Sequence, residues 1–173
     1  MHFIVQSLKG YPSTFAKDNR TPWMHSYLYK NQMPSSIRSC FTVSTLYSNM
    51  TSNNKTSVFR VLCQSLNELK RQQLANTSQE KLARAQALFI YQIIGLFDGD
   101  VTLRSNADQN MRLLQDWLDE LCQIRENLRT PESMNDPNPP RSWEVGTLTF
   151  SPIPLTNGRS GGYFLSLSGE PSL

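Results

Sequence analysis

The sequence has no long apolar run and little charge of either sign. None of its 173 residues belongs to an apolar stretch near the roughly 18 residues that a membrane-spanning helix needs. The first residues, MHFIVQSLKG, hold only a short apolar run, Phe-Ile-Val, so we expect no secretory signal peptide. Charged residues make up 18% of the chain and the formal net charge is +3, which is too small to indicate a nucleic-acid-binding face. The sequence therefore predicts neither a membrane protein nor a strongly basic surface.

Cysteine is scarce, and its spacing excludes the usual cysteine-based sites. Cys40, Cys63 and Cys122 lie far apart with no CxxC pair, and neither His2 nor His25 stands at ligand spacing from any of them. An odd, dispersed set of cysteines excludes a disulfide framework and a closed zinc site. No neighbouring histidine or lysine pattern activates any of the three thiols. We therefore expect all three to be small buried apolar residues.

Catalytic and cofactor-binding motifs are also absent. The chain has no phosphate-binding loop, no Rossmann glycine pattern, no HExxH and no nucleophile elbow. The closest candidates are Asp98 and Asp100, which flank Gly99, but this segment lacks the further oxygen ligands of a calcium loop. We interpret it as a helix stop followed by an N-cap. The sequence predicts that the protein is not an enzyme, with no catalytic, cofactor-binding or metal-binding residue and no cofactor.

What the sequence does contain is a series of apolar residues at helical spacing. Gly10, with Pro12 beyond it, predicts the stop of a short first helix, and Ser35 or Ser36 can cap the second helix. The many aromatic residues at positions 11–34 predict an ordered connector. The expected helices cover residues 2–9, 35–49, 56–75, 77–97 and 101–128. The third of them is expected to bury a stripe that contains Phe59, Leu62, Cys63, Leu66 and Leu69.

The fourth expected helix has the clearest start signal and the widest apolar surface. Thr77 and Glu80 have the spacing of a capping box. The apolar residues that follow are Leu82, Ala85, Leu88, Phe89, Ile90, Ile93, Ile94 and Phe97. A surface of this width belongs at the centre of a bundle. The predicted fold class is therefore all-α, a helical bundle whose interior is centred on Leu88, Phe89 and Ile93.

The fifth expected helix has one apolar stripe and one acidic side. The stripe contains Leu103, Ala107, Met111, Leu114, Leu118, Leu121 and Ile124. Asp116, Asp119 and Glu120 lie on the other side, where we expect a solvated face. Trp117 interrupts this polar side and has two interpretations. It is either an edge contact within the domain or the place where a further part of the protein packs.

Composition changes near residue 130. The segment 130–173 holds seven of the ten prolines and five of the eight glycines. We therefore divide the chain into a helical domain, residues 1–129, and a Pro/Gly-rich, poorly ordered C-terminal tail, residues 130–173. The alternation at residues 147–151 also allows a weak hairpin within this tail. Trp143 is either a core residue or part of a partner surface.

Residues 83–100 read ARAQALFIYQIIGLFDGD. This run resembles a segment in the regulatory region of many filamentous-fungal transcription factors, the fungal-specific transcription factor domain of zinc-cluster and zinc-finger regulators. Arg104 and the Leu-Leu-Gln-Asp-Trp run that ends at Trp117 resemble the positions that follow in the family. The resemblance covers about residues 3–128. It implies a helical regulatory domain, a location in the nucleus and a function in transcription regulation through protein or effector binding.

The chain departs from the family pattern in two places, the zinc-binding region and the segment after the fifth expected helix. The six closely spaced cysteines of the DNA-binding zinc region are not in this sequence, so the resemblance does not imply direct DNA binding. The residues from Ser142 to Glu144 resemble the start of the family's next segment, whereas residues 145–173 resemble nothing in it. Our hypothesis is that the chain is a truncated member, and that this last segment arises from a shifted reading frame or a retained intron.

A partial helical domain leaves apolar faces without partners, which makes the isolated chain marginally stable. We therefore expect protein partners, self-association among them. The alternative interpretation is a stand-alone small helical protein-interaction module that is unrelated to DNA.

Overall fold

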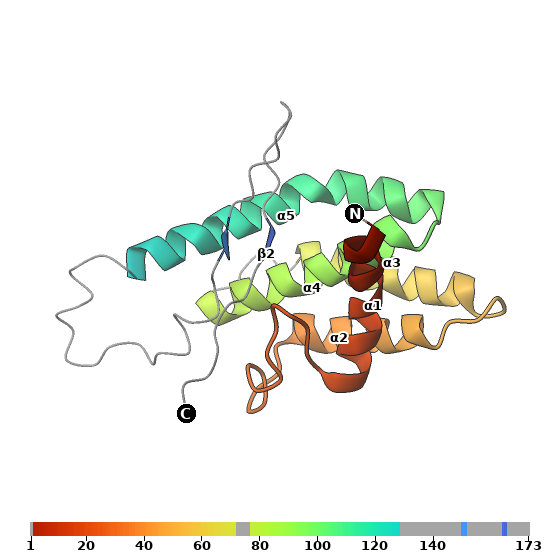
Figure 1. Ribbon diagram of the computed structural model, residues 1–173, viewed down its shortest axis with the longest axis horizontal. Coiled ribbons are helices and arrows are strands. Elements are labelled where there is room, and N and C mark those ends of the chain that lie inside the picture. The colour runs from red at the N-terminus through yellow and green to blue at the C-terminus, as the bar shows by residue number, and fades with distance from the viewer. Residues whose placement is uncertain (1, 72–76, 129–149, 152–163, 166–173) are drawn as a thin grey trace. The chain divides into compact units, whose positions relative to one another are not determined.

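The computed structural model describes residues 2–71, 77–128, 150–151 and 164–165 (Figure 1). These residues form five α-helices and one short pair of strands. The helices are α1 (His2–Asp18), α2 (Ser35–Ser48), α3 (Lys55–Arg71), α4 (Ser78–Phe97) and α5 (Val101–Leu128). The chain divides into two compact units, Met1–Leu121 and Cys122–Leu173, and the first of these is called the bundle below. The predicted all-α helical bundle is confirmed.

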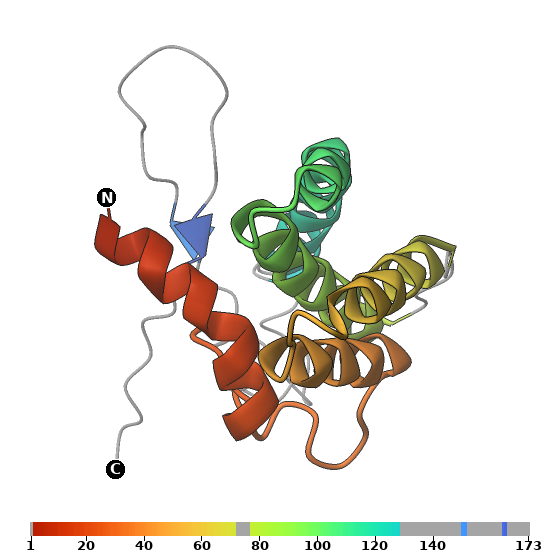
Figure 2. The same ribbon diagram turned by 90° about the vertical axis from the view of Figure 1, so that its right-hand side faces the viewer.

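Helix α4 lies at the centre of the bundle and contacts α1, α2 and α3 (Figure 2). The predicted apolar face is confirmed for Leu88, Ile90, Ile93 and Ile94, which are at most 3% exposed. It is wrong for Leu82, Phe89 and Phe97, which are half-buried. The predicted capping box is also present. The Thr77 hydroxyl accepts a hydrogen bond from the backbone N–H of Glu80 at 3.2 Å, and the Thr77 N–H donates to the Glu80 carboxylate at 3.4 Å. Local sequence signals thus set the start of the helix that the other helices surround.

The prediction that the first helix stops at Gly10 is wrong, because α1 continues through Gly10 and Pro12 to Asp18. A proline inside a helix removes one backbone hydrogen bond. Pro12 and Phe15 are fully buried here, and the Phe15 ring meets the Phe41 ring of α2 edge-on at 5.8 Å. Packing against α2 therefore offsets the local cost of the proline.

Helix α1 ends where Asn19 adopts a positive φ of 50°, a conformation that favours glycine or asparagine after a helix. The connector beyond it is ordered, as predicted for this part of residues 11–34. Thr21 and Met24 exchange two backbone hydrogen bonds of 2.9 and 3.1 Å, which form a tight turn around Trp23. This turn directs the Trp23 side chain into the core, where it is 6% exposed.

Trp23 and Gln86 fasten the connector to α4. The Trp23 ring meets Tyr11 of α1 and Phe89 of α4 edge-on, each at 4.8 Å between ring centroids. The Gln86 amide donates to the Trp23 carbonyl at 2.9 Å and accepts from the Tyr29 hydroxyl at 2.6 Å. A buried amide needs such partners, because an unpaired one costs about 1–3 kcal/mol. The aromatic residues of the connector are therefore part of the core.

Two predictions about α2 and α3 need correction. Helix α2 begins at Ser35, but neither Ser35 nor Ser36 caps it, because Pro34 stands at the N-cap position without a side-chain hydrogen bond. The expected stripe on α3 is rotated slightly. Val58, Leu62 and Leu69 are buried, whereas Phe59, Cys63 and Leu66 are half-buried. The part of this predicted helix at residues 72–75 lies outside the described residues.

Helix α5 has the predicted bounds, and Leu103, Ala107, Leu114 and Leu121 are buried as expected. Met111 was expected in the same stripe and is 43% exposed. The buried position is taken by Asn110. Its side chain donates to the Asn106 carbonyl at 2.6 Å and accepts from Lys70 of α3 at 3.2 Å. Cross-helix hydrogen bonding makes this polar side chain acceptable inside the stripe.

Helix α5 runs antiparallel to α4 after the turn at residues 98–100 (Figure 1). Gly95 of α4 lies close to Leu103 and Ala107 of α5. A Cβ atom on Gly95 would lie 2.9 Å from the Ala107 Cβ and 3.1 Å from the Leu103 carbonyl oxygen. The Gln92 amide donates to the Ala107 carbonyl at 3.0 Å. The contact thus depends on the missing side chain of Gly95.

In the second unit, Phe150–Ser151 (β1) pairs antiparallel with Phe164–Leu165 (β2), with Phe150 opposite Leu165. This pairing includes part of the alternation at residues 147–151. The predicted disorder of the tail and the position of Trp143 fall on residues 129–149, 152–163 and 166–173, outside the described residues. Across the described helices, none combines the length and the apolarity needed to cross a bilayer.

The two glycines inside helices predict opposite effects of one substitution. Gly10→Ala places its methyl group in open space and should stabilise the chain by about 0.5–1 kcal/mol through helix propensity. Gly95→Ala should destabilise it, because the new methyl group meets Ala107 and backbone. Chemical denaturation of both variants measures the difference. Gly95→Ala combined with Ala107→Gly should recover part of the loss, and equal effects at the two glycines would contradict the close approach.

Candidate functional site

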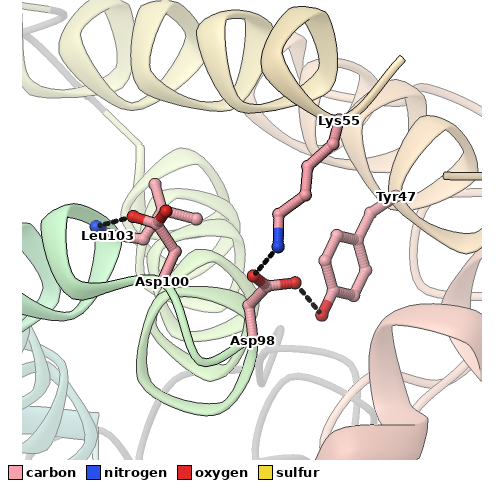
Figure 3. Close-up of polar contacts among 5 residues, drawn as sticks. All are labelled: Tyr47, Lys55, Asp98, Asp100 and Leu103. Atoms are coloured by element: carbon pink, nitrogen blue, oxygen red, sulfur yellow. Dashed lines mark hydrogen bonds and ion pairs between the residues drawn. The ribbon is translucent and has the colours of Figure 1, made fainter. Parts of the chain in front are cut away.

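The turn between α4 and α5 contains the sequence candidates Asp98 and Asp100 (Figure 3). The interpretation as a helix stop and an N-cap is confirmed. Gly99 has a φ of +98°, and the Asp100 carboxylate accepts from the backbone N–H of Leu103 at 2.9 Å. The backbone N–H of Asp98 continues the α4 pattern by donating to the Ile94 carbonyl at 3.0 Å. Asp100 therefore acts within its own helix.

Asp98 does more than end a helix, because its carboxylate joins three of them (Figure 3). The Tyr47 hydroxyl at the end of α2 donates to one oxygen at 3.1 Å, and the Lys55 ammonium at the start of α3 lies 3.3 Å from the other. The Asp98 side chain is 5% exposed, and the Lys55 side chain is 45% exposed. We call Tyr47, Lys55 and Asp98 the Asp98 cluster.

Both charges of the Asp98 cluster stand at the unfavourable end of their own helix. Lys55 is the first residue of α3, where the helix dipole disfavours a cation, and Asp98 follows the last residue of α4, where it disfavours an anion. Each placement costs about 0.3–1 kcal/mol. The ion pair offsets both costs, and the Lys55 ammonium gains a second contact 4.9 Å above the Phe59 ring. The sequence signal for this cluster was therefore a lysine at the N-terminal end of one helix and an aspartate at the C-terminal end of another. We did not use this signal to predict the cluster.

The chemistry of the Asp98 cluster is that of a fixed hydrogen-bond donor and a fixed ion pair. Burial, the neighbouring Asp98 charge and the hydrogen bond to Asp98 together raise the pKa of Tyr47 to about 12, and burial is the largest of the three causes. The Tyr47 hydroxyl thus stays neutral near neutral pH and donates to Asp98. Both carboxylate oxygens are already engaged, so the arrangement holds helices together.

A second polar set lies between the start of α4 and the later part of α5. The Arg84 guanidinium lies 4.3 Å above the Trp117 ring, and the Lys81 ammonium lies 2.8 Å from the Glu120 carboxylate. Burial lowers the pKa of Arg84, and the Glu120 charge opposes this shift. The structure thus places Trp117 in contact with α4. Asp116, Asp119 and Glu120 are exposed, as expected for a solvated face.

The three cysteines differ in their surroundings. Cys40 is fully buried as expected, burial raises the pKa of its thiol, and its sulfur donates to the Ala87 carbonyl at 3.9 Å. The expectation of burial is wrong for Cys63 and Cys122, which are half-buried. Among the described residues no three His, Cys, Asp or Glu side chains gather closely enough to hold a metal ion.

A surface hollow borders the exposed side of α3 and is lined by Arg60, Cys63, Gln64, Asn67, Glu68 and Arg71. All of these residues come from one helix. Except for Cys63, the lining residues have polar or charged side chains.

A comparison with curated proteins finds transcription factor gsfR2 of Penicillium aethiopicum, which is 32% identical to this chain over 139 residues. The match covers 76% of this chain and 31% of gsfR2. This chain is a relative of a fungal transcription factor. It spans about a third of the length of the curated relative that it matches. No protein-family model and no solved structure matches the chain. The resemblance inferred from residues 83–100 is confirmed at this level, and truncation of the chain stays a prediction.

Exchanging the charges of the Asp98 cluster should preserve it. Lys55→Glu or Asp98→Lys alone should cost about 1–3 kcal/mol, because each leaves like charges together in a largely buried place. The double variant should return to within about 1 kcal/mol of the original, because it keeps the pair and puts both charges at favourable helix ends. Denaturant unfolding of all four proteins gives the coupling energy.

The pair Lys81 and Glu120 is the control for this exchange, because its carboxylate is 47% exposed whereas that of Asp98 is 5% exposed. The same reversals there should change the unfolding free energy by less than about 1 kcal/mol. Additive single effects at Lys55 and Asp98 would show that the two charges do not interact.

Tyr47 predicts a loss of stability at alkaline pH. Folding raises its pKa from the ordinary 10.0 to about 12, so the unfolded chain releases this proton at lower pH than the folded chain. The stabilisation is complete below about pH 10 and is lost as pH rises toward about 12. Tyr47→Phe lacks this proton, so its unfolding free energy should fall less steeply over the same interval. Denaturation curves at several pH values give both slopes, and parallel slopes would contradict a buried Tyr47 hydroxyl.

Proposed function

We propose that this chain is part of a nuclear transcription regulator whose helical bundle acts by binding another protein or an effector. The 32% identity to transcription factor gsfR2 across 76% of the chain carries this proposal. A relative that regulates transcription supports the same role for the shared region. Because the chain spans 31% of gsfR2, the proposal concerns the helical region and not every function of the longer protein.

We propose interaction rather than catalysis because the buried polar side chains Gln86 and Asp98 bond to other parts of the bundle. The Gln86 amide bonds the connector, and the Asp98 carboxylate bonds Tyr47 and Lys55. An acid–base catalyst needs a titratable group that can reach a substrate. The carboxylate of Asp98, at 5% exposure, does not meet that requirement.

We further propose that the bundle does not bind DNA directly. The exposed cations belong to different helices, such as Lys17 on α1, Arg38 on α2 and Arg60 on α3. Sequence-specific DNA binding uses a concentrated set of basic side chains that approach one groove. The chain also lacks the closely spaced cysteines of a zinc cluster. We therefore propose that the bundle acts by binding a protein, a second copy of this chain included, or an effector, and not by binding DNA.

A tethering experiment tests this function. The full chain is fused to an unrelated DNA-binding domain, and expression of a reporter gene with the matching site is measured in a fungal host. We expect reporter expression to change relative to the DNA-binding domain alone. Leu88→Asp, which places a charge in the centre of the bundle, should abolish the change.

A gel-shift experiment with the full chain addresses DNA binding. We expect no salt-resistant complex with duplex DNA near 0.15 M salt, because scattered cations give only weak, screened attraction. An unchanged reporter would contradict a role in transcription regulation and favour the stand-alone interaction module. A sequence-specific complex at that salt concentration would contradict the proposal that the bundle does not bind DNA directly.

A further inference from the structure

The Asp98 carboxylate is almost fully buried, with 5% of its side chain exposed. In three other ion pairs between described residues the carboxylate side chain is 47–60% exposed, at Asp18, Glu120 and Glu126. Exposed pairs contribute little to stability because water and salt screen them. A buried carboxylate depends on its cation, since removal of that cation leaves an uncompensated charge. We therefore expect the charge of Lys55 to contribute more to the stability of the fold than the charge of a lysine in an exposed ion pair.

Lys55 is nevertheless accessible from solution. Its side chain is 45% exposed, and it opens α3 directly after residues 51–54, which are all exposed. The buried partner and the accessible partner are thus on different elements. Nearly half of the Lys55 side-chain surface is open to solvent, whereas the carboxylate that depends on its charge is buried.

We propose that Lys55 is a lysine-acylation site, at which an acyl group from an acyl thioester removes the cation that holds Asp98 and loosens the turn between α4 and α5. This inference deepens the proposed function, because it names a chemical input to the same helical bundle.

The transfer is balanced as follows. The Lys55 amine, after loss of a proton to the base of an acyltransferase, attacks the thioester carbonyl carbon. A C–N amide bond forms, the C–S bond breaks, and the thiol leaves with its proton restored. No oxidant or reductant is needed. The product side chain is neutral, and it loses both the ion pair and the cation–π contact.

Loss of the Lys55 charge has opposite effects on the stability of the N-terminal end of α3 and of the C-terminal end of α4. Helix α3 loses a cation from its N-terminal end, which relieves an unfavourable dipole interaction. Asp98 keeps only the neutral Tyr47 hydroxyl, at 3.1 Å, and remains beside the carbonyl end of α4. The destabilised place is therefore the α4–α5 turn, while α3 itself is not weakened.

The test uses the full chain with acetyl-lysine installed at position 55 by codon reassignment, and amide hydrogen exchange as the readout. Exchange of amides at residues 94–103 should accelerate by at least about tenfold, because local opening sets their protection. Lys55→Gln should reproduce this effect, and Lys55→Arg, which keeps the charge, should not. Acetyl-lysine at position 81 is the matched control and should leave the same amides unchanged, because Lys81 pairs with an exposed carboxylate.

A second measurement tests whether Lys55 is acetylated in the folded chain. The folded chain is incubated with acetyl-coenzyme A and a broad-specificity lysine acetyltransferase, and peptides are analysed by mass spectrometry. We expect acetylation at Lys55 alongside exposed lysines such as Lys17. Modification of Lys17 without Lys55, or unchanged exchange in the acetyl-Lys55 chain, would overturn the inference.

The results of the exchange and acetylation measurements can be distinguished from those of the tethering experiment. A reporter that responds to the chain while acetyl-Lys55 leaves the turn unchanged removes this inference alone. Faster exchange in a chain that leaves the reporter unchanged removes the proposed function and keeps the acylation-sensitive turn.

Discussion

The burial of α4 is the constraint on which the rest of the bundle depends. Its side chains face α1, α2 and α3, so a polar group on α4 has little access to water and is stabilised by a partner from another element. Gln86 bonds the connector, Gln92 bonds α5, and Asp98 bonds the ends of α2 and α3. Two polar residues of α4 and the residue that ends it therefore bond to four other parts of the chain. Apolar packing forms the core, and these polar contacts determine how the helices and the connector are positioned around α4.

The need of buried polar groups for partners also explains the Asp98 cluster. Asp98 looks like part of a candidate ligand site in the sequence, and in the fold it holds helices together. Asp98 stands in the run Phe-Asp-Gly-Asp, where a carboxylate pair beside glycine suggests a ligand site. In the fold, one of these carboxylates caps α5 and the other pairs with Lys55 and Tyr47. A site of this kind responds to changes of charge. This property connects the fold to the proposed regulatory function, since a regulator needs a state that an input can alter.

Sequence reasoning was accurate where neighbouring residues decide the outcome. The capping box at Thr77 and Glu80, the positive φ of Gly99 and the N-cap at Asp100 involve residues at most four positions apart. It was wrong where a distant contact overrides a local preference. Pro12 is inside a helix because Phe15 packs on Phe41. The Asp98 cluster was missed for the same reason, since Tyr47 and Asp98 are 51 positions apart.

The sequence by itself determined the all-α class, the central position of α4, the bounds of α5 and the resemblance to fungal transcription factors. These depend on apolar periodicity, capping chemistry and a continuous run of residues, all of which are local properties. Only the tertiary structure decided that Asn110 replaces Met111 in the buried stripe and that Lys55 meets Asp98. Both outcomes depend on which helices become neighbours. The free energy of a buried polar group is set by partners that are distant in sequence, so no local pattern can assign it.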